Sequence, residues 1–410
     1  MSSPCTTGEP VLTPGGFPTV GMVGGGQLAR MSAPAAVALG VRLAVLAENP
    51  DDSAALVVPA TSIGSHLDAG AVRAFARGVH VLTFDHEHVP TDLLHELEDA
   101  GHAVRPGPDA LVHAQDKAVM RARLATLGVP MPRWALIRTP EELAAFADGA
   151  GDVDGVGWPV VLKTTRGGYD GKGVHRVGSV TEAIGRLAHA SASGVALLAE
   201  EAVDFRRELA AVVARSPSGQ AAAWPVVATT QVDGVCREVI APAPDLDDDL
   251  ATEATAIALR IAGELGVVGV LAVELFEVPG ADGAPARVLV NELAMRPHNS
   301  GHWSIDGAIT SQFEQHLRAV LDLPLGDPRA RAAWTVMVNV LGGDHPDLYR
   351  SYLHVMARDP GVKVHLYGKG VRPGRKIGHV TVCTDDPHGL DDALARARHA
   401  ADFIRGVIDE

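Results

Sequence analysis

The feature that most restricts the fold of this chain lies near its N-terminus, where an apolar strand runs directly into a glycine turn. Residues 20–23 form the strand, Gly24 to Gly26 form the turn, and a helical stretch leads to a second apolar strand that ends at Glu48. Apolar strands joined through a helix are typical of a parallel sheet that is covered on both faces. We therefore expect an α/β domain over residues 18–112, preceded by a flexible tail at residues 1–17.

Farther along, the pattern of strands and helices changes. Two more apolar runs, at residues 56–58 and 79–84, still fit the α/β domain, and residues 113–128 then read as one helix that ends at a glycine. From residue 158 to about residue 325, long apolar strands alternate with glycine-rich turns, and one clear helix covers residues 250–265. This pattern favours an α+β body.

A break at Pro324 and Pro328 separates this body from a third unit. The expected boundaries are therefore residues 113–328 for the central domain and 329–410 for the C-terminal domain. Together with the first domain, they predict a multidomain protein that combines α/β and α+β parts.

Composition excludes several classes of function. The 410 residues carry a formal net charge of -15, which argues against a general nucleic-acid binder, because phosphate backbones are held mainly by Lys and Arg. The three cysteines stand far apart and show no metal-ligand spacing, as in proteins of a reducing compartment. The sequence shows neither a secretory signal nor an apolar run long enough for a membrane span. We therefore expect a soluble cytoplasmic protein.

The first glycine turn is open to three interpretations. The residues from Gly24 to Ala29 match the G-x-G-x-x-A pattern, and Glu48 ends the next strand about 20 residues later, where a dinucleotide-binding domain places its acidic ribose ligand. The same glycines also suit a tight strand-to-helix turn that binds nothing. A third interpretation is that the helix N-terminus receives a substrate phosphate.

A second glycine-rich segment, in the middle of the chain, predicts a phosphate site. Lys163 follows an apolar strand, and the loop from Gly167 to Gly173 has four glycines in seven residues. Such a loop lets backbone N–H groups approach phosphate oxygens, and the lysine adds a point charge. The alternative is an ordinary glycine-rich hairpin.

The next apolar strand ends in acidic residues that suit a nucleoside. Glu200 and Glu201 close this strand and Glu208 follows shortly after. The backbone at Ala202 and Val203 could pair with adenine, while Glu201 or Glu208 accepts ribose hydroxyls. Ordinary surface charge is the alternative explanation.

Two more carboxylates lie inside apolar strands. Glu274 and Glu292 have hydrophobic neighbours, so each would be a costly buried charge unless it is compensated. On adjacent strands they could face each other, and Mg²⁺ commonly takes one or two carboxylates together with nucleotide phosphates. Asn291 could add an oxygen ligand. Salt bridges from both carboxylates to arginines are the alternative.

Cationic and donor-rich segments follow the second carboxylate. The turn R-P-H-N-S-G-H-W begins at Arg296, and residues 369–376 contain four cations in eight positions of an acidic protein. Arg and Lys bind phosphate through charge-assisted hydrogen bonds, so this cluster suits a phosphorylated substrate. A solvated basic loop is the alternative.

At these residues the sequence resembles the 5-(carboxyamino)imidazole ribonucleotide synthases, which are members of the ATP-grasp superfamily. The resemblance is carried by GGGQLARM, TFDHEHVP, GGYDGKG, NELAMRPHNSGHW and GKGVRPGRKIGH, and so covers nearly everything after the tail. It implies a Rossmann-like N-terminal domain, an ATP-grasp body with a mobile lid around residues 133–203, and a small C-terminal domain. It also implies a homodimer.

The reaction that the resemblance implies joins bicarbonate to the amine of 5-aminoimidazole ribonucleotide in purine biosynthesis, through carboxyphosphate, while ATP is cleaved to ADP and phosphate. Its cofactors would be ATP and Mg²⁺, with the magnesium carboxylates at Glu274 and Glu292. The implied nucleotide ligands are Lys117, Lys163, Gly168, Tyr169, Asp170, Gly171, Lys172, Gly173, Val174, Glu200, Glu201, Ala202, Val203, Glu208, Asn291 and Glu292. The implied substrate ligands are Gly26, Gln27, Leu28, Tyr169, Asp170, Lys172, Arg296, His298, Asn299, Lys369, Arg372, Arg375 and Lys376.

Four of these residues are expected to act in catalysis, namely Asp170, Lys172, Arg296 and His298, with Asp170 and His298 as alternative bases. Lys172 stands where the family commonly has arginine, which keeps the charge but loses the planar fork. The rival functions are a formate-dependent glycinamide ribonucleotide ligase, a biotin carboxylase, a nicotinamide dehydrogenase and a non-catalytic nucleotide-binding regulator.

Overall fold

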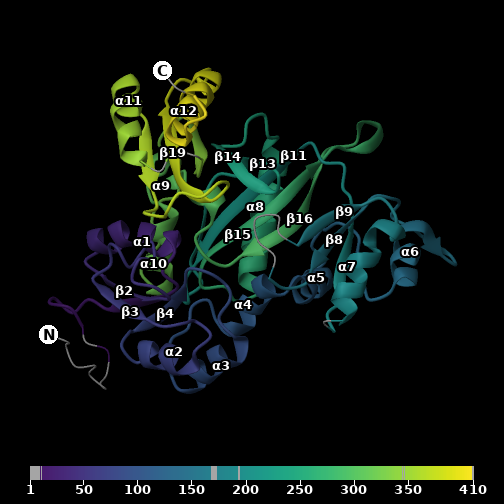
Figure 1. Ribbon diagram of the computed structural model, residues 1–410, viewed down its shortest axis with the longest axis horizontal. Coiled ribbons are helices and arrows are strands. Elements are labelled where there is room, and N and C mark those ends of the chain that lie inside the picture. Colours follow the sequence, from purple (N-terminus) through teal and green to yellow (C-terminus); the bar gives the residue numbers. More distant parts are fainter. Residues whose placement is uncertain are drawn as a thin grey trace.

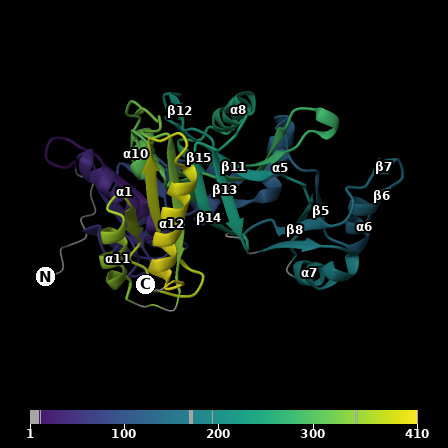
Figure 2. The same cartoon turned by 90° about the horizontal axis from the view of Figure 1, so that it is seen from above.

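The computed structural model describes residues 10, 12–167, 173–192, 194–343, 345 and 347–408. Three parts are visible in Figure 1: the N-terminal sheet, a central body with the C-terminal strands beside it, and a separate small sheet that projects to the right. Figure 2 shows from above that this small sheet extends away from the body. The C-terminal helices lie on the same side of the body as α1.

The N-terminal part is the α/β unit that the glycine turn predicts. Its four strands are all parallel and lie in the order β3-β2-β1-β4. Its elements are β1 (Thr19–Val23), α1 (Gln27–Ala38), β2 (Arg42–Ala47), β3 (Ala60–Ile63), α2 (Ala69–Ala76), β4 (Val81–Phe84) and α3 (Thr91–Asp99). The apolar run at residues 56–58 forms no strand: it lies in a turn before β3, and Leu56 and Val57 are exposed.

The prediction of a single helix over residues 113–128 is wrong, because two helices occupy this region. They are α4 (Pro108–Gln115) and α5 (Lys117–Thr126). Asp116 between them is extended, and its side chain accepts hydrogen bonds from the N–H groups of Ala118 and Val119. An aspartate at this position caps a new helix, so α5 starts at Lys117.

Residues 134–201 form the small separate sheet, which we name the lid sheet. Its antiparallel strands lie in the order β5-β10-β8-β9. The elements are β5 (Trp134–Ile137), α6 (Pro140–Asp148), β6 (Gly149–Ala150), β7 (Val153–Asp154), β8 (Val160–Thr164), β9 (Val174–Val177), α7 (Val180–Ala192) and β10 (Leu197–Glu201). The glycine-rich loop connects β8 to β9, and its residues 168–172 lie outside the described residues.

The body is built around a nine-stranded sheet in the order β16-β15-β11-β13-β14-β17-β19-β18, with β12 paired to β11. The body elements are β11 (Arg207–Arg215), β12 (Ala221–Ala223), β13 (Val227–Val232), β14 (Val235–Ala241), α8 (Asp248–Glu264), β15 (Gly269–Val278), η1 (Ala281–Gly283), β16 (Arg287–Ala294), η2 (Asn299–Gly301), α9 (Ser304–Gly307) and α10 (Gln312–Val320). This mixture of long hairpins and few helices confirms the predicted α+β body.

The C-terminal strands continue the body sheet, because β14 pairs directly with β17. The elements of this part are β17 (Trp334–Leu341), η3 (Leu348–Arg350), α11 (Ser351–Arg358), β18 (Lys363–Leu366), β19 (Lys376–Thr384) and α12 (Leu390–Arg405). The segment between β18 and β19 is the basic segment that begins at Lys369. In the order of the sheet, β19 and β18 lie at the edge opposite β16 and β15.

Candidate active site

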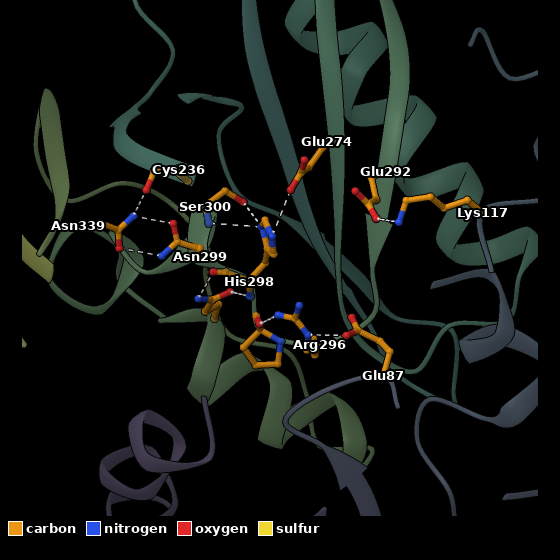
Figure 3. A network of polar contacts seen from close by, with 12 residues as sticks. Glu87, Lys117, Cys236, Glu274, Glu292, Arg296, His298, Asn299, Ser300 and Asn339 are labelled. Carbon is orange, nitrogen blue, oxygen red and sulfur yellow. Dashed lines mark hydrogen bonds and ion pairs between the residues drawn. The ribbon is translucent and has the colours of Figure 1, made fainter. Parts of the chain in front are cut away.

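The centre of the site is a pair of carboxylates on neighbouring strands. Glu274 of β15 and Glu292 of β16 are cross-strand partners, so their side chains share one face of the sheet. Figure 3 shows them side by side above the turn that carries Arg296 and His298. Burial raises the pKa of Glu274 to about 8, with further contributions from the nearby charges of Glu292 and Glu208. The facing carboxylates therefore repel each other in a partly dehydrated place.

Each carboxylate has one close partner of its own. Lys117 Nζ lies 2.6 Å from Glu292 Oε1, and His298 Nε2 lies 3.2 Å from Glu274 Oε1. The other ring nitrogen of His298 is 2.8 Å from Ser300 Oγ, which orients the ring. Burial and the cations Arg296 and Lys376 lower the pKa of His298 to about 3, so its imidazole is neutral at pH 7.

This pair fits a magnesium ion that arrives with a nucleotide. Mg²⁺ prefers oxygen ligands and often uses one or two carboxylates plus phosphate oxygens. A divalent cation between Glu274 and Glu292 would relieve the repulsion that raises the pKa of Glu274. Within the described part of the chain, no group of three or more His, Cys, Asp or Glu is arranged to hold a metal. The two carboxylates therefore suit an ion whose remaining ligands come from phosphate and water.

Lys163 lies beside this pair at the end of β8. Its Nζ is 2.6 Å from Glu200 Oε2 and donates a 3.0 Å hydrogen bond to Asn291 Oδ1. The other oxygen of Glu200 lies 2.6 Å from Arg121, which is fully buried. Both oxygens of Glu200 are thus bonded to protein cations, so the geometry favours Glu200 as a group that positions Lys163 over one that binds the nucleotide directly.

Three of the predicted nucleotide residues line a cleft between the lid sheet and the body. Its walls include Glu201, Ala202 and Val203 from the end of β10, and Val278 and Arg287 from the β15–β16 hairpin. Glu208 is the second residue of β11, and burial raises its pKa. Val174 opens β9 and is exposed, next to Gly173, whose φ of 78° suits a glycine.

On the opposite side of the carboxylates lie the cations of the predicted substrate site. Arg296 Nε donates a 2.8 Å hydrogen bond to Glu87, which follows β4 of the N-terminal sheet. Lys369 bonds the side chain of Gln27 at the start of α1. Lys376 lowers the pKa of Glu274 through its charge, so it lies near this carboxylate.

Three predicted substrate residues do not point into this group. Arg372 and Arg375 lie in the exposed turn before β19. Asn299 is buried and exchanges hydrogen bonds with Asn339, at 3.0 and 2.8 Å. Its amide therefore holds the turn against the body sheet.

The first glycine turn is filled by a carboxylate. Asp85 accepts the N–H of Ala29 at 3.0 Å, and a Cβ at Gly26 would lie 1.9 Å from Asp85 Oδ2. Glu48, the residue that the dinucleotide interpretation needs, is bonded to His66 at 3.0 Å. The glycine at position 26 is thus required by Asp85, and Leu28 behind it is buried. This arrangement favours a turn that packs closely over one that cradles a pyrophosphate.

Other members of the predicted site lie outside the described residues, namely Gly168, Tyr169, Asp170, Gly171 and Lys172. The sequence analysis also missed residues that the structure places in the site. Arg121 gave no signal because it reads as one more polar residue of a helix. Gln312 was missed for the same reason, yet its amide bonds both the N–H and the carbonyl of His298, each at 2.8 Å. Glu87 lies within the quoted TFDHEHVP motif but was not assigned.

Comparisons with known proteins agree with this geometry. Three family models match consecutive parts of the chain: the ribonucleotide synthetase preATP-grasp domain over residues 17–115, the ATP-grasp domain over 122–313, and the phosphoribosylaminoimidazole carboxylase C-terminal domain over 335–393. No helix among the described residues is both apolar enough and long enough to cross a membrane.

Relatives match over almost the full chain. The N5-carboxyaminoimidazole ribonucleotide synthase of Mycobacterium tuberculosis is 56% identical over 402 residues, which cover 97% of this chain and 91% of the relative. The crystal structure of the Thermus thermophilus synthetase is 38% identical, with a TM-score of 0.81 over 93% of this chain and 98% of that one. The Aspergillus clavatus synthase, solved with ADP and 5-aminoimidazole ribonucleotide, is 31% identical, with a TM-score of 0.82 over 95% and 98% of the two chains. The chain therefore belongs to the N5-carboxyaminoimidazole ribonucleotide synthase family of ATP-grasp ligases.

Proposed function

We propose that the carboxylate pair, the lid sheet and the basic segment together form one active site for an ATP-dependent carboxylation. ATP binds between the lid sheet and the body, and Glu274 and Glu292 are the residues that would hold its Mg²⁺. The enzyme joins bicarbonate to the exocyclic amine of 5-aminoimidazole ribonucleotide, which lies on the side of Arg296 and Lys376. The products are 5-(carboxyamino)imidazole ribonucleotide, ADP and phosphate.

The observation that carries this proposal is the cross-strand register of Glu274 and Glu292. It places two carboxylates on one face, with Lys163 on the lid side and Arg296 on the other side. A site with cations on both sides of a carboxylate pair can hold two anionic substrates and bring their reacting groups together. Such positioning is the main source of catalysis in phosphoryl transfer.

The reaction begins when a bicarbonate oxygen attacks the γ-phosphorus and the bond to ADP breaks, giving carboxyphosphate. Glu274 and Glu292 would hold a Mg²⁺ ion, which would neutralise negative charge on the phosphates. Lys163, held by Glu200 and Asn291, places its charge beside the transferring group. The backbone N–H groups of the glycine-rich loop would donate hydrogen bonds to the same group. A closed lid excludes water, which would otherwise destroy the activated carboxylate.

The second step is attack of the amine on the carboxyl carbon, either of carboxyphosphate or of CO₂ released from it, and phosphate leaves. Arg296 and Lys172 stabilise the carboxylate, and the residues around Lys369 and Gln27 hold the ribonucleotide phosphate. Asp170 and His298 are the two candidates for accepting the amine proton. Replacing each with asparagine and measuring the pH profile of kcat would distinguish them, because the profile loses its acidic limb when the base is removed.

Several further features belong to the same proposal. The lid sheet moves as a unit during closure, the three domains divide near residues 112 and 328, and the enzyme works as a cytoplasmic homodimer. Sedimentation of the purified protein at several concentrations tests the dimer directly, since a single species of one-chain mass at all concentrations would contradict it.

The experiment that tests the function is an ADP-release assay with ATP, Mg²⁺ and 5-aminoimidazole ribonucleotide, with and without bicarbonate. ADP release should require both the ribonucleotide and Mg²⁺. The carboxylated product should appear only when bicarbonate is supplied. ADP release that depends on formate or biotin in place of this ribonucleotide would instead favour another ligase.

A further inference from the structure

Arg121 is the buried charge that connects the two halves of the nucleotide site. It lies on α5, one turn after Lys117, and its side chain is 0% exposed. A guanidinium carries five N–H donors and keeps its charge at any physiological pH, so complete burial requires partners on several sides. Those partners come from two different sheets.

On the lid side, the partner is Glu200 at the end of β10. Arg121 Nε and one terminal nitrogen both lie 2.6 Å from Glu200 Oε1. The second oxygen of Glu200 holds Lys163 Nζ at 2.6 Å. Arg121 thus compensates the charge of Glu200 at one oxygen, while the other oxygen orients Lys163.

On the body side, the partners are two consecutive carbonyls of β16. Arg121 donates to Val290 O at 2.9 Å and to Asn291 O at 2.8 Å. In a regular strand, consecutive carbonyls point to opposite edges. The pairing of β15 with β16 shifts at this point, since Glu274 faces Glu292 whereas Leu275 faces Val290. The extra residue is Asn291, so Arg121 holds a β-bulge.

This bulge has a chemical consequence at the site. Alternation along a regular strand would turn neighbouring side chains to opposite faces. Here Asn291 Oδ1 bonds Lys163 while Glu292, the next residue, bonds Lys117 and faces Glu274. Two adjacent side chains of β16 therefore lie in the same site because of the bulge. Arg121 bonds the backbone carbonyls of that bulge.

We propose that Arg121 is a positioning residue for the ATP half of the reaction. Through Glu200 it sets the place of Lys163, and through the bulge it sets the places of Asn291 and Glu292. It touches no substrate, because it is fully buried. This inference rests on the proposed function, since it takes Lys163 and Glu292 as the groups that meet ATP and Mg²⁺.

The test compares Arg121→Met and Arg121→Lys with Arg123→Met as the matched control. Arg123 lies on the same helix, but its side chain is 41% exposed and pairs with Glu264 at the surface. Each variant is assayed for kcat and for the KM of ATP and of 5-aminoimidazole ribonucleotide, per mole of folded enzyme measured by circular dichroism. The concentration of Mg²⁺ that gives half-maximal rate is measured as well.

Arg121→Met should lower kcat/KM for ATP by about 100-fold while the KM of the ribonucleotide changes by less than about 2-fold. Arg121→Lys should recover most of the ATP affinity, because its ammonium still neutralises Glu200. It should keep a raised Mg²⁺ requirement, because one ammonium cannot reproduce the planar fork that bonds both carbonyls of the bulge. Arg123→Met should behave as the unsubstituted enzyme.

A merely structural Arg121 would give a different result. The folded fraction would fall, but the folded enzyme would keep its KM for ATP and its Mg²⁺ requirement, and that outcome overturns the inference. If Arg121→Met does not fold, the Mg²⁺ requirement of Arg121→Lys tests the inference alone. A raised requirement supports it, and an unchanged requirement overturns it. Calorimetric binding of ADP with Mg²⁺ separates the two proposals: an unsubstituted enzyme that binds ADP but does not carboxylate contradicts the function, whereas equal binding by the Arg121 variants contradicts the positioning role.

Discussion

Two carboxylates of this enzyme, the buried Glu200 at the end of the lid sheet and the partly buried Glu274 in the body sheet, have opposite electrostatic surroundings. Burial alone would raise the pKa of Glu200, but Lys163 and Arg121 outweigh it and hold the pKa below its ordinary value. Burial also raises the pKa of Glu274, and there the neighbouring Glu292 and Glu208 raise it further. The same residue type, close to the same cleft, is thus compensated in one sheet and uncompensated in the other.

This difference shows which carboxylate is part of the protein's framework and which is built to receive a ligand. A carboxylate with both oxygens bonded to buried cations has little capacity left for a substrate, and it stabilises the folded protein through those bonds. A carboxylate that faces another carboxylate costs stability until a cation arrives. Electrostatic surroundings therefore separate roles that the residue type alone does not.

The largest expected effect comes from Glu292→Gln, which removes one charge of the uncompensated pair. Turnover should fall by about 1000-fold or more, because a metal ligand contributes several kcal/mol of charge stabilisation in the transition state. The measurement is ADP release at saturating ATP and Mg²⁺. Glu264→Gln, at an exposed position of α8, is the control. A rate within a few-fold of the unsubstituted enzyme would refute the metal role of Glu292.

Glu200→Gln breaks the compensated site and should cost both stability and activity. Arg121 and Lys163 would be left as buried cations with a neutral partner, so the free energy of unfolding should fall by about 3 kcal/mol. The catalytic efficiency with ATP should fall by about 100-fold through the displaced Lys163. Urea unfolding and the ADP-release assay measure the two effects. Unchanged stability would show that the cations do not depend on Glu200.

Lys117→Met tests how far Lys117 compensates the negative charge of the carboxylate pair in the body sheet. Lys117 lies 2.6 Å from Glu292, and its loss leaves the carboxylate pair in place but removes a cation from the phosphate side. We expect the KM of ATP to rise by about 10-fold with a smaller change in kcat. Lys363→Met, at an exposed position of β18, should change neither constant. A larger loss in kcat than in KM would assign Lys117 to the transition state.

Glu274→Gln should abolish catalysis yet stabilise the protein in the absence of nucleotide, by about 1 kcal/mol at pH 8.5. The sign follows from the raised pKa. Between the ordinary value of 4.5 and about 8 the folded protein binds more protons than the unfolded chain, so the free energy of unfolding falls as pH rises through this window. Glu274→Gln removes this loss of stability. The difference in the free energy of unfolding between the variant and the unsubstituted protein should therefore vanish at pH 4.5.

Urea unfolding at the two pH values, without nucleotide or Mg²⁺, measures this difference. Destabilisation at pH 8.5 would mean that His298 and Lys376 already compensate Glu274 in full. In that case the contrast with Glu200 would not hold.

Local patterns were enough to predict much of the fold and the central pair of the site. The strand before Gly24 and the long apolar strands of the body lie where the pattern of apolar residues predicts strands. Glu274 and Glu292 stand out in sequence because a charge inside an apolar strand needs an explanation. Partners from distant segments could not be found in this way: Arg121 has no apolar context of its own, and its bonds reach residues 79 and 169 positions away.

Two other details of the structure do not follow from the apolar pattern. The apolar run at residues 56–58 lies in a turn, and Ser53 just before it donates a hydrogen bond to the carbonyl of Tyr367 in the C-terminal part. The break at Asp116 depends on a capping hydrogen bond that an aspartate inside a helix would not make. The contact of Ser53 joins distant segments, whereas the cap at Asp116 is a local contact.

The pairing of β14 with β17 means that the C-terminal part is not an appendage of the body. A chain that stops before Trp334 would leave β14 as an open edge with unpaired backbone groups, a surface on which other copies can add strands. It would also lack Lys376, the first residue of β19. During synthesis the last fifth of the chain must therefore be inserted into a sheet that is already folding, and shortened products should aggregate before they could act as partial enzymes.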